Sequence, residues 1–494
     1  MTSATKAENK MKTLMVAINA KYVHTNIAVR YITEYTKRQG LDFDFCEFTI
    51  NEPQNSVLGK LYAADCDAYG FSCYIWNIGY VLRLCQNLKK LLPDRKIFLG
   101  GPEVSFDAEK LLCENEFIDC IVCGEGELAV PELVKDFPSE RKVIHGEKIK
   151  DLADLPFPYS DDDLKATVAG EKLVYYETSR GCPFNCSYCL SSVDAGVRFL
   201  SLDRVKAEIK RFSDSGAMTV KFVDRTFNAD KKRALEIWKY CIELDTKTCF
   251  HFEIGADLLD DETIGVLKTA PEGRFQFEIG IQSTNEKTVL EICRVTNLER
   301  LAENIKKLRL HTKVHLHTDL IAGLPVENFE SFAKSFNDAY AMTPHVIQLG
   351  FLKFLKGSPM RERSAMHGAV FDDFAPYEVF STNWISYSEI LRLKSVEDVL
   401  ERYFNSGRFI RTLKKAIPKF DTPFDFYHNL AMFWEKKGLV GQGVKRISLY
   451  GLLYEFLRAD MTEEELKPVI AEMKKDFSDW HSNGVGTPEW YKLY

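Results

Sequence analysis

The stretch Thr178-Ser-Arg-Gly-Cys-Pro-Phe-Asn-Cys-Ser-Tyr-Cys-Leu-Ser-Ser192 places three cysteines, Cys182, Cys186 and Cys189, at C-x-x-x-C-x-x-C spacing. A structural zinc site closes with four ligands, whereas a 4Fe-4S cube held by three cysteines keeps one iron free for another ligand. The apolar run from Leu173 to Tyr176 is typical of a strand that ends in a ligand loop. The spacing therefore favours a 4Fe-4S cluster over a zinc site or a redox-active cysteine pair.

At these residues the sequence resembles the radical SAM superfamily. The resemblance implies that the open iron binds the amino and carboxylate groups of S-adenosylmethionine (SAM). One electron from the cluster then splits the sulfonium, and a 5'-deoxyadenosyl radical removes a hydrogen atom from the substrate. The electron would come from an external donor of the flavodoxin or ferredoxin type. Cys182, Cys186 and Cys189 are then the metal ligands at the catalytic centre, with Tyr188 beside the cofactor.

Length and composition restrict the class of protein. The chain has 494 residues, enough for about three domains. Its hydrophobic fraction of 45% and charged fraction of 28% are those of a globular protein. A net charge of -7 disfavours nucleic acid as a partner. The polar first ten residues do not resemble a signal peptide, and no long uncharged apolar run predicts a membrane span. We therefore expect a cytoplasmic protein in a reducing compartment.

Residues 1–150 alternate short apolar runs with helical periods, which predicts a doubly wound, Rossmann-like α/β domain. Three expected strand ends, Ser72–Trp76, Gly100–Ser105 and Gly124–Glu127, carry residues that would let a large ligand approach the backbone. The arrangement resembles the cobalamin-binding domain fused to many radical SAM enzymes, so cobalamin is a candidate third cofactor. The Asp-x-His-x-x-Gly motif of other cobalamin domains is missing, and the alternative is a domain that kept the shape and lost the corrin.

Polar residues at these strand ends are the predicted substrate contacts: Asn19, Tyr22, His24, Asn26, Glu103 and Glu125. For the first loop the simpler alternative is a cap, with Thr25 or Asn26 as N-cap of the next helix. Cys120 and Cys123 lie in a strand-like run. A spacing of three places them on opposite faces of a strand, which excludes a shared metal or redox site.

The rest of the chain divides into three predicted regions. Residues 151–171 are interpreted as a linker, because Asp151–Tyr159 is acidic and rich in proline and therefore extended rather than helical. Residues 172–376 resume the alternation of strands and helices, as the partial (β/α) barrel of the resembled family requires. Residues 377–494 show helical periodicity rich in aromatic residues and predict a helical C-terminal domain.

In such a barrel the polar residues at the carboxyl ends of the strands reach the active site. By resemblance, Glu253 or Glu278 looks like the carboxylate that binds the SAM ribose hydroxyls, and the Gly-Leu-Pro turn at Gly323 flanks the adenine. A salt bridge or strand cap at the barrel rim is the simpler interpretation of each. The full set of predicted cofactor contacts is Tyr188, Asp224, Arg225, Asn228, Glu253, Glu278, Gln282, Ser283, Gly323 and Leu324.

The resemblance implies hydrogen-atom abstraction from a small molecule. With cobalamin bound, the expected outcome is methyl transfer to an unactivated carbon; without it, the outcome is radical fragmentation. We expect the second, a lyase, because the architecture is similar to that of the radical SAM lyase that cleaves queuine during 7-deazaguanine base salvage. The alternatives are a cobalamin-dependent methyltransferase, a methylthiotransferase, which the lack of a second cysteine trio disfavours, and a non-catalytic iron-sulfur electron carrier.

Overall fold

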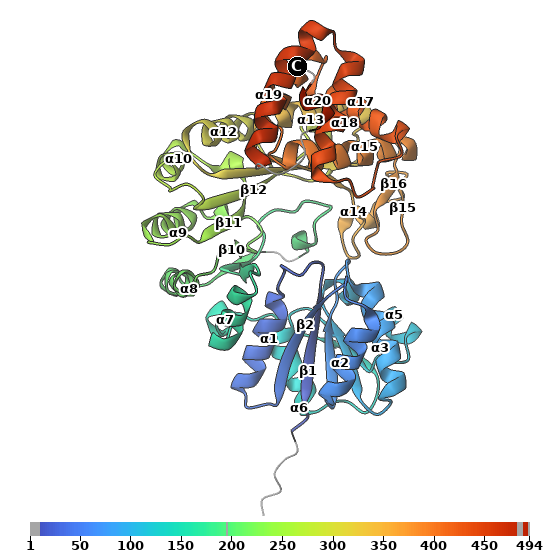
Figure 1. Ribbon diagram of the computed structural model, residues 1–494. Helices are drawn as coiled ribbons and strands as arrows, with labels where there is room; N and C mark the ends of the chain where they lie inside the picture. Colours follow the sequence, from blue (N-terminus) through green and yellow to red (C-terminus); the bar gives the residue numbers. More distant parts are fainter. Residues whose placement is uncertain (1–9, 194–195, 482–487, 493–494) are drawn as a thin grey trace, which may run out of the picture.

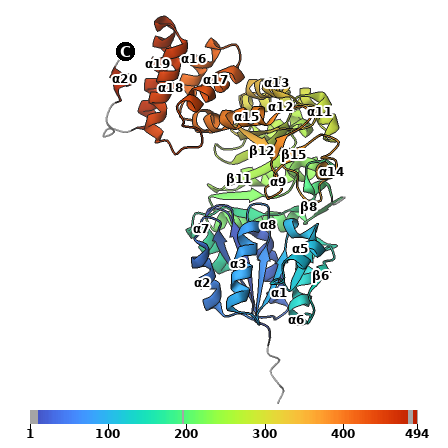
Figure 2. The same cartoon turned by 90° about the vertical axis from the view of Figure 1, so that its right-hand side faces the viewer.

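The computed structural model describes residues 10–193, 196–481 and 488–492. Three parts follow one another along the molecule: an N-terminal α/β domain, a curved parallel sheet flanked by helices, and a C-terminal group of helices (Figure 1). A view turned by 90° shows the same sequence of parts (Figure 2). None of the helices in the described ranges combines the length and apolar character that a bilayer crossing requires.

The N-terminal domain is built on a parallel sheet of six strands in the order β2-β1-β3-β4-β5-β6. The strand order reverses between β1 and β3, and ligands of doubly wound domains bind beyond the carboxyl ends at such a point. The predicted fold class is therefore confirmed for this part. The strands are β1 (Thr13–Asn19), β2 (Phe43–Thr49), β3 (Ala68–Ser72), β4 (Lys96–Gly100), β5 (Cys120–Cys123) and β6 (Lys142–His145).

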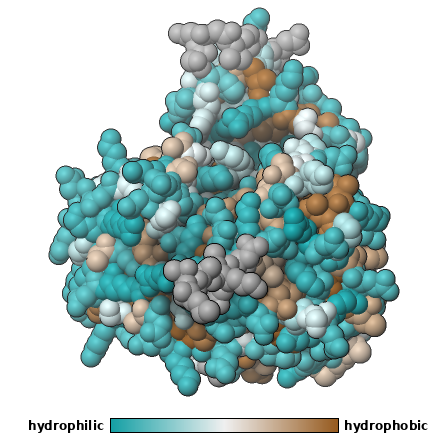
Figure 3. Space-filling view, turned by 90° about the horizontal axis from the view of Figure 1, so that it is seen from below, coloured by the Kyte–Doolittle hydropathy of each residue, from teal (hydrophilic) through white to brown (hydrophobic). Residues whose placement is uncertain are grey.

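Helices cover both faces of this sheet. Val29 of α1 and Val130 of α6 are buried in the core on one face of the sheet. Val57 of α2, Val81 of α3 and Leu112 of α5 are buried in the core on the other face. The end of the domain that faces away from the barrel presents a mostly hydrophilic surface (Figure 3). The helices are α1 (Ile27–Arg38), α2 (Gln54–Ala64), α3 (Ile78–Leu91), α4 (Pro102–Ser105), α5 (Ala108–Glu114) and α6 (Gly126–Lys135).

The two cysteines of β5 point to opposite sides of the sheet. Cys120 packs in the core under α1 and α6, and Cys123 packs in the core under α2, α3 and α5. Both are free thiols. The predicted placement of these cysteines on opposite faces of the strand is confirmed.

The predicted linker is wrong in one respect, because residues 161–169 form a helix. Ser160 accepts a hydrogen bond from the backbone N–H of Asp163 at 3.2 Å and so caps α7 (Asp161–Ala169). The aspartates that suggested a solvated connector lie in its first turn, where negative charge is favourable. Leu155 and Tyr159 of the same segment are buried in the barrel core, so it belongs to the packed structure.

The central sheet has six parallel strands in the order β14-β13-β12-β11-β10-β7, the partial barrel that was predicted. The side chains of β12 alternate: Phe275, Phe277 and Ile279 are buried against the outer helices, while Glu278 and Gln282 point inward. The strands are β7 (Val174–Tyr176), β10 (Thr219–Phe222), β11 (Cys249–Ile254), β12 (Phe275–Gln282), β13 (His315–Ala322) and β14 (Val346–Phe351).

The outer helices of the barrel follow its strands in turn. They are α8 (Leu202–Asp214), α9 (Lys231–Glu243), α10 (Asp261–Leu267), α11 (Glu286–Glu291), α12 (Leu298–His311) and α13 (Phe329–Ala341).

The C-terminal region is helical, as expected, except at its start. A two-stranded antiparallel ribbon of β15 (Val370–Phe371) and β16 (Val379–Ser381) crosses the predicted boundary at residue 377. The helices that follow are α15 (Tyr387–Leu400), α16 (Ile410–Ala416), α17 (Pro423–Lys436), α18 (Arg446–Asp460), α19 (Glu463–Trp480) and α20 (Glu489–Lys492).

The packing of β3 gives a test of the N-terminal fold. A Cβ at Gly70 would lie 2.3 Å from Cζ of Phe98 and 2.4 Å from Sδ of Met15. Gly70→Ala should therefore lower the free energy of unfolding by about 1–3 kcal/mol, as measured by urea denaturation followed by circular dichroism. Gly59→Ala, in α2 with nothing within 4 Å, is the matched control and should be neutral or stabilising. An unchanged urea midpoint for Gly70→Ala would contradict this packing.

Candidate active site

The cysteine loop connects the two strands of a short hairpin at the mouth of the barrel. β8 (Ser179–Gly181) runs directly into Cys182 and pairs with β9 (Val197–Phe199). Gly181 has φ 106°, and a Cβ there would lie 2.1 Å from the carbonyl oxygen of Gly196. Only glycine therefore fits this position immediately before the first cysteine.

The three cysteines line one cavity of about 200 Å³ at the carboxyl ends of the barrel strands. The cavity brings together residues that lie far apart in the sequence, from β10 to β13 and from the loop after α11. Besides Cys182, Cys186 and Cys189, the lining residues with polar or charged side chains are Tyr188, Ser191, Arg225, Thr226, Glu253, Asp257, Glu278, Gln282, Arg294 and Asp319. Five of the predicted cofactor contacts, Tyr188, Arg225, Glu253, Glu278 and Gln282, are among them.

The two candidate ribose carboxylates differ in their surroundings. Glu278 lies 2.9 Å from Nζ of Lys221 and 3.1 Å from Nε2 of His251. Burial opposes ionisation of Glu278, but these two partners outweigh it and lower its pKa to about 2. Among the described residues, Glu253 has a single ion-pair partner, Lys221, whose Nζ lies 4.0 Å away. Burial and the repulsion of Glu278 raise the pKa of Glu253 to about 7. Glu253 is thus the carboxylate that protein partners leave available.

Asp224 and Asn228 were among the predicted cofactor contacts, and the structure shows both as buried supports instead. Asp224 accepts hydrogen bonds from the backbone N–H and hydroxyl of Thr178, at 3.0 and 2.6 Å, and from the hydroxyl of Ser179 at 2.5 Å. It therefore fixes the strand that enters the cysteine loop. Asn228 exchanges hydrogen bonds with the backbone of Gly255, at 2.8 and 2.9 Å, and shapes the loop after β11.

Ser283, Gly323 and Leu324 also lie behind the cavity wall. The hydroxyl of Ser283 is buried and donates to Oε1 of Glu327 at 2.6 Å. Leu324 is fully buried, and a Cβ at Gly323 would meet the side chain of Val379 at 2.7 Å. These residues pack the turn after β13 against β16, so their predicted contact with a cofactor has no support in this geometry.

Arg294 is the main residue that the sequence analysis missed. It lies in the loop between α11 and α12, outside any strand end, where no pattern singled it out. Its Nη2 donates to the carbonyl of Gly280, and its Nη1 donates to the hydroxyl of Tyr188 at 3.3 Å. Its Nε is buried with no hydrogen-bond partner among the described residues. A buried guanidinium with a free N–H beside Cys186 can bind a carboxylate or a sulfur in the cavity.

The predicted substrate contacts of the N-terminal domain are mostly used within the protein. Asn19 donates to the carbonyl of His24 at 3.0 Å, and Nδ1 of His24 lies 2.6 Å from the hydroxyl of Tyr175 in the barrel. Asn26 accepts from the N–H of Val29 and is the N-cap of α1, the alternative considered for this loop.

The two predicted acidic contacts join the N-terminal domain to the rest of the chain. Glu103 accepts a hydrogen bond from the hydroxyl of Tyr377 and lies 3.4 Å from Nζ of Lys356. Glu125 pairs with Arg180 and Arg198 on the hairpin. Among the predicted substrate contacts, Tyr22 has its side chain largely exposed, at 63%.

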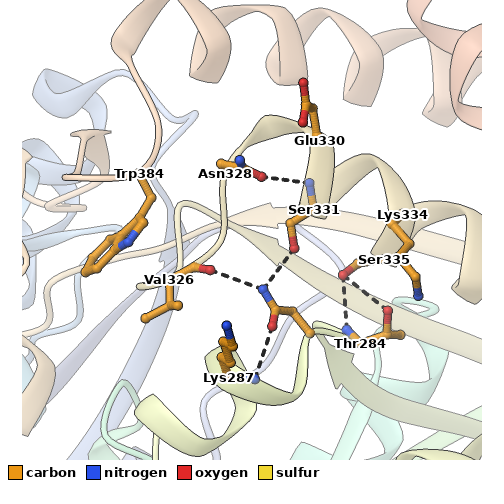
Figure 4. Close-up of a pocket in the computed structure, with 10 residues that line it drawn as sticks. Thr284, Lys287, Val326, Asn328, Glu330, Ser331, Lys334, Ser335 and Trp384 are labelled. Atoms are coloured by element: carbon orange, nitrogen blue, oxygen red, sulfur yellow. Dashed lines mark hydrogen bonds between the residues drawn. The ribbon is translucent and has the colours of Figure 1, made fainter.

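A larger cavity of about 620 Å³ lies apart from the cysteines, between the loops after β12 and β13, α13 and the segment that precedes α15. Trp384 stands on one side, and Ser331, Lys334 and Ser335 of α13 stand on the other (Figure 4). Lys334 is paired with Asp338 at 2.6 Å. This cavity shares no lining residue with the cysteine cavity.

Comparison with protein-family models assigns each part of the chain. Residues 13–134 match the B12 binding domain, residues 176–339 match the radical SAM superfamily, and residues 365–492 match a protein of unknown function, DUF4080. The chain therefore carries an N-terminal B12-binding domain followed by a radical SAM domain.

Among curated proteins, the chain is similar to 2-(S-pantetheinyl)-carbapenam-3-carboxylate methyltransferase of Streptantibioticus cattleyicolor and to the cobalamin-dependent radical SAM methyltransferase TokK of Streptomyces tokunonensis. Each is 25% identical over 363 residues, which is 66% of this chain and 52% of the relative. The chain thus spans about half the length of these relatives. Several methylthiotransferases match shorter parts, for example 26% identity over 32% of this chain for RimO of Myxococcus xanthus.

Among solved structures, the fold is shared with the cobalamin-dependent SAM radical enzyme OxsB, bound to aqua-cobalamin and SAM. The TM-score is 0.65 at 14% identity, covering 95% of this chain and 84% of OxsB. The methyltransferase TsrM from Kitasatospora setae, with tryptophan substrate and a SAM analogue bound, gives a TM-score of 0.60 at 14% identity over 74% of this chain and 79% of TsrM.

The domain matches support the predicted 4Fe-4S cluster and SAM, and they support cobalamin as the third cofactor. The expected lyase and its queuine substrate find no support in the relatives described above, whose names favour the methyltransferase alternative.

The cysteine cavity fits an iron-sulfur cube. Its three thiols are the only cysteine side chains that line it among the described residues, and the cavity also carries unpaired polar atoms for a further ligand. Among the described residues, no three His, Cys, Asp or Glu side chains form a group suited to a single metal ion.

The N-terminal domain offers a fitting surface for a flat ligand such as a corrin. Tyr22, Trp76 and Phe106 follow the carboxyl ends of β1, β3 and β4, and between 41% and 63% of each is exposed. Tyr74 and Trp76 stack with ring centroids 4.4 Å apart. In contrast, Gly101 serves the protein itself, because a Cβ there would lie 2.6 Å from the carbonyl of Cys73. The close approach that requires glycine at residue 101 is therefore made by the protein backbone and not, as predicted, by a ligand.

The side chains of Glu253 and Glu278 should affect the stability of the folded protein in opposite directions. In the folded protein the pKa of Glu253 is raised to about 7, so its contribution is lost as pH rises from the ordinary carboxyl range toward that value. Glu253→Gln should therefore unfold at a higher temperature than the wild type at pH near 8 and at the same temperature at pH near 5. The pKa of Glu278 is lowered to about 2, so Glu278→Gln should unfold at a lower temperature at both pH values. Thermal unfolding followed by circular dichroism measures both, and a destabilised Glu253→Gln at high pH would contradict the assignment.

Proposed function

We propose that this protein is a cobalamin-dependent radical SAM methyltransferase that acts on a small molecule. One observation carries the proposal: three cysteines and an available carboxylate line one cavity of a radical SAM barrel, next to a B12-binding domain in the same chain. The names of the two curated relatives, both methyltransferases, support methyl transfer over fragmentation.

The residues of the barrel divide the work of holding the cofactors. Cys182, Cys186 and Cys189 would bind three irons of the cluster, which supplies the electron that cleaves SAM. The cavity is rich in carboxylates, and their negative charge suits the sulfonium cation of SAM. Glu253, whose ion-pair partner Lys221 is as far away as 4.0 Å, would accept hydrogen bonds from hydroxyls of the nucleoside, while Arg294 would hold a carboxylate.

The N-terminal domain would hold cobalamin, which carries the transferred methyl group when it is bound. Tyr22, Trp76 and Phe106 would present apolar surface to the corrin at the carboxyl edge of the sheet. The loop after β1 keeps this edge against the barrel, because the N–H of Leu173 donates to the carbonyl of Val23 at 2.8 Å. The substrate would lie between this edge and the cysteine cavity. Reductive cleavage of SAM would also require an external one-electron donor of the flavodoxin or ferredoxin type.

Radical SAM chemistry can be tested before the substrate is known. Protein reconstituted with iron and sulfide under anaerobic conditions, then given SAM and dithionite, should release 5'-deoxyadenosine. Cys186→Ala should reduce this release to background, because the cluster loses a ligand. Cys113→Ala removes an exposed thiol on α5 outside the cavity and should leave the release unchanged. Equal release by Cys186→Ala and the wild type would contradict the proposal.

Cobalamin binding separates the methyltransferase from the lyase. The cluster-loaded protein should retain stoichiometric hydroxocobalamin through gel filtration, measured by corrin absorbance. A protein that releases 5'-deoxyadenosine but retains no corrin would refute the cobalamin-dependent methyltransferase.

A further inference from the structure

The Gly-Glu-Gly-Glu segment of the N-terminal domain, residues 124–127, contacts the hairpin that carries the cysteine loop. Nη2 of Arg180 donates to Glu127 at 2.8 Å, and Nη1 of Arg180 lies 3.2 Å from Glu125. A third carboxylate, Glu177, receives bonds from the same guanidinium at 2.8 to 3.2 Å. Arg180 stands two residues before Cys182, so this ion cluster lies at the base of the loop.

The hairpin needs this contact because of its own sequence. Arg180 and Arg198 are directly opposite each other on β8 and β9. Like charges at directly opposite positions of an antiparallel pair repel and destabilise it. Glu125 lies between them: both of its carboxylate oxygens accept hydrogen bonds from Arg198, and one of the two also lies 3.2 Å from Arg180. The hairpin has only three residues in each strand, so it has few contacts of its own to offset the repulsion.

The cluster is well shielded from water. The side chains of Arg180, Glu125, Glu127 and Glu177 are 18%, 12%, 6% and 15% exposed. Removing one partner of a buried ion pair leaves the other charge without compensation, which is far more costly than losing an exposed pair. The arrangement therefore depends on each member, and two of its carboxylates come from the domain that precedes the barrel.

We propose that Glu125 and Glu127 are positioning residues for the iron-sulfur cluster: through Arg180 and Arg198 they hold the hairpin, and with it Cys182, in the geometry that binds the cluster. This assignment rests on the proposed cluster at the three cysteines. It gives the Gly-Glu-Gly-Glu segment a role toward the barrel rather than toward substrate, and it couples the B12-binding domain to the cysteine loop through ion pairs of the protein itself.

The test compares cluster retention in Glu125→Gln, Glu127→Gln and the wild type. Each variant is reconstituted anaerobically and then exposed to an iron chelator, and the loss of absorbance near 400 nm is followed. Both variants should lose iron about 10-fold faster than the wild type. This factor is the lower end of the effect that is usual when a group that orients a metal ligand is removed. The electron paramagnetic resonance signal of the dithionite-reduced cluster, with and without SAM, should also change.

Asp163→Asn is the matched control. Asp163 pairs with buried Arg30 of α1 at 2.7 Å and joins the N-terminal domain to α7, but it does not contact the hairpin. It should unfold at a lower temperature than the wild type while it retains iron at the wild-type rate. A loss of iron that follows thermal stability alone, equal in Asp163→Asn and Glu127→Gln, would overturn the inference.

A double variant tests whether Glu127 acts through Arg180. Glu127→Gln and Arg180→Gln combined should lose iron no faster than the more affected single variant, because both changes break the same contact. Additive effects would refute a joint action.

If Glu125→Gln does not fold, Glu127→Gln and Arg180→Lys carry the same test, since both leave Glu125 and Arg198 paired. A wild type that takes up no cluster would refute the proposed function. Wild-type iron retention and spectra in both glutamine variants would refute this inference alone.

Discussion

The segment from Cys182 to Cys189 contains no helix or strand, so it cannot hold three thiols in place by itself. Apart from one turn, in which the N–H of Cys189 donates to the carbonyl of Cys186 at 3.1 Å, the constraints on it come from other parts of the chain. The N–H of Ser187 donates to the carbonyl of Ile292 at 2.9 Å, and the carbonyl of Ser187 accepts from Met360 at 2.8 Å. Asp224 fixes the entering strand, and the N-terminal domain fixes the hairpin. A site built this way needs the whole chain to be folded, which explains why its residues are so far apart in sequence.

The alternation of strands and helices indicated the barrel, and the family resemblance pointed to two carboxylates, but neither could distinguish Glu253 from Glu278. Their difference depends on neighbouring strands: Glu253 and Glu278 are register partners, and Lys221 is the register partner of His251. This register places Lys221 and His251 against Glu278, whereas burial and the repulsion of Glu278 dominate the pKa of Glu253. Sequence patterns give the face of a strand on which a residue lies, whereas pKa depends on partners from other strands.

Partners from distant parts of the sequence also explain why the predicted substrate contacts at the N-terminal strand ends turned out to contact the protein itself. Their positions were predictable, because apolar runs followed by glycine and polar residues mark the carboxyl ends of parallel strands. Their partners were not, since Glu103 and Glu125 find Tyr377 and Arg198 at sequence separations that no local pattern covers. The helix over residues 161–169 differs, because Ser160 followed by three aspartates is a local capping signal that the preceding prolines obscured.

A partial barrel also leaves two edge strands with unpaired backbone groups, and each edge is covered by another part of the chain. Beside β7, the backbone N–H of Leu173 donates to Val23, and its carbonyl accepts from the hydroxyl of Thr25 at 2.9 Å. At β14 the side-chain amide of Asn405 exchanges hydrogen bonds with Ile347, at 2.9 and 3.0 Å, in the manner of a further strand. The B12-binding domain and the C-terminal helices thus close the sheet from opposite sides. Because an exposed parallel edge would be open to pairing with other chains, these flanking regions serve the barrel's fold as well as its chemistry.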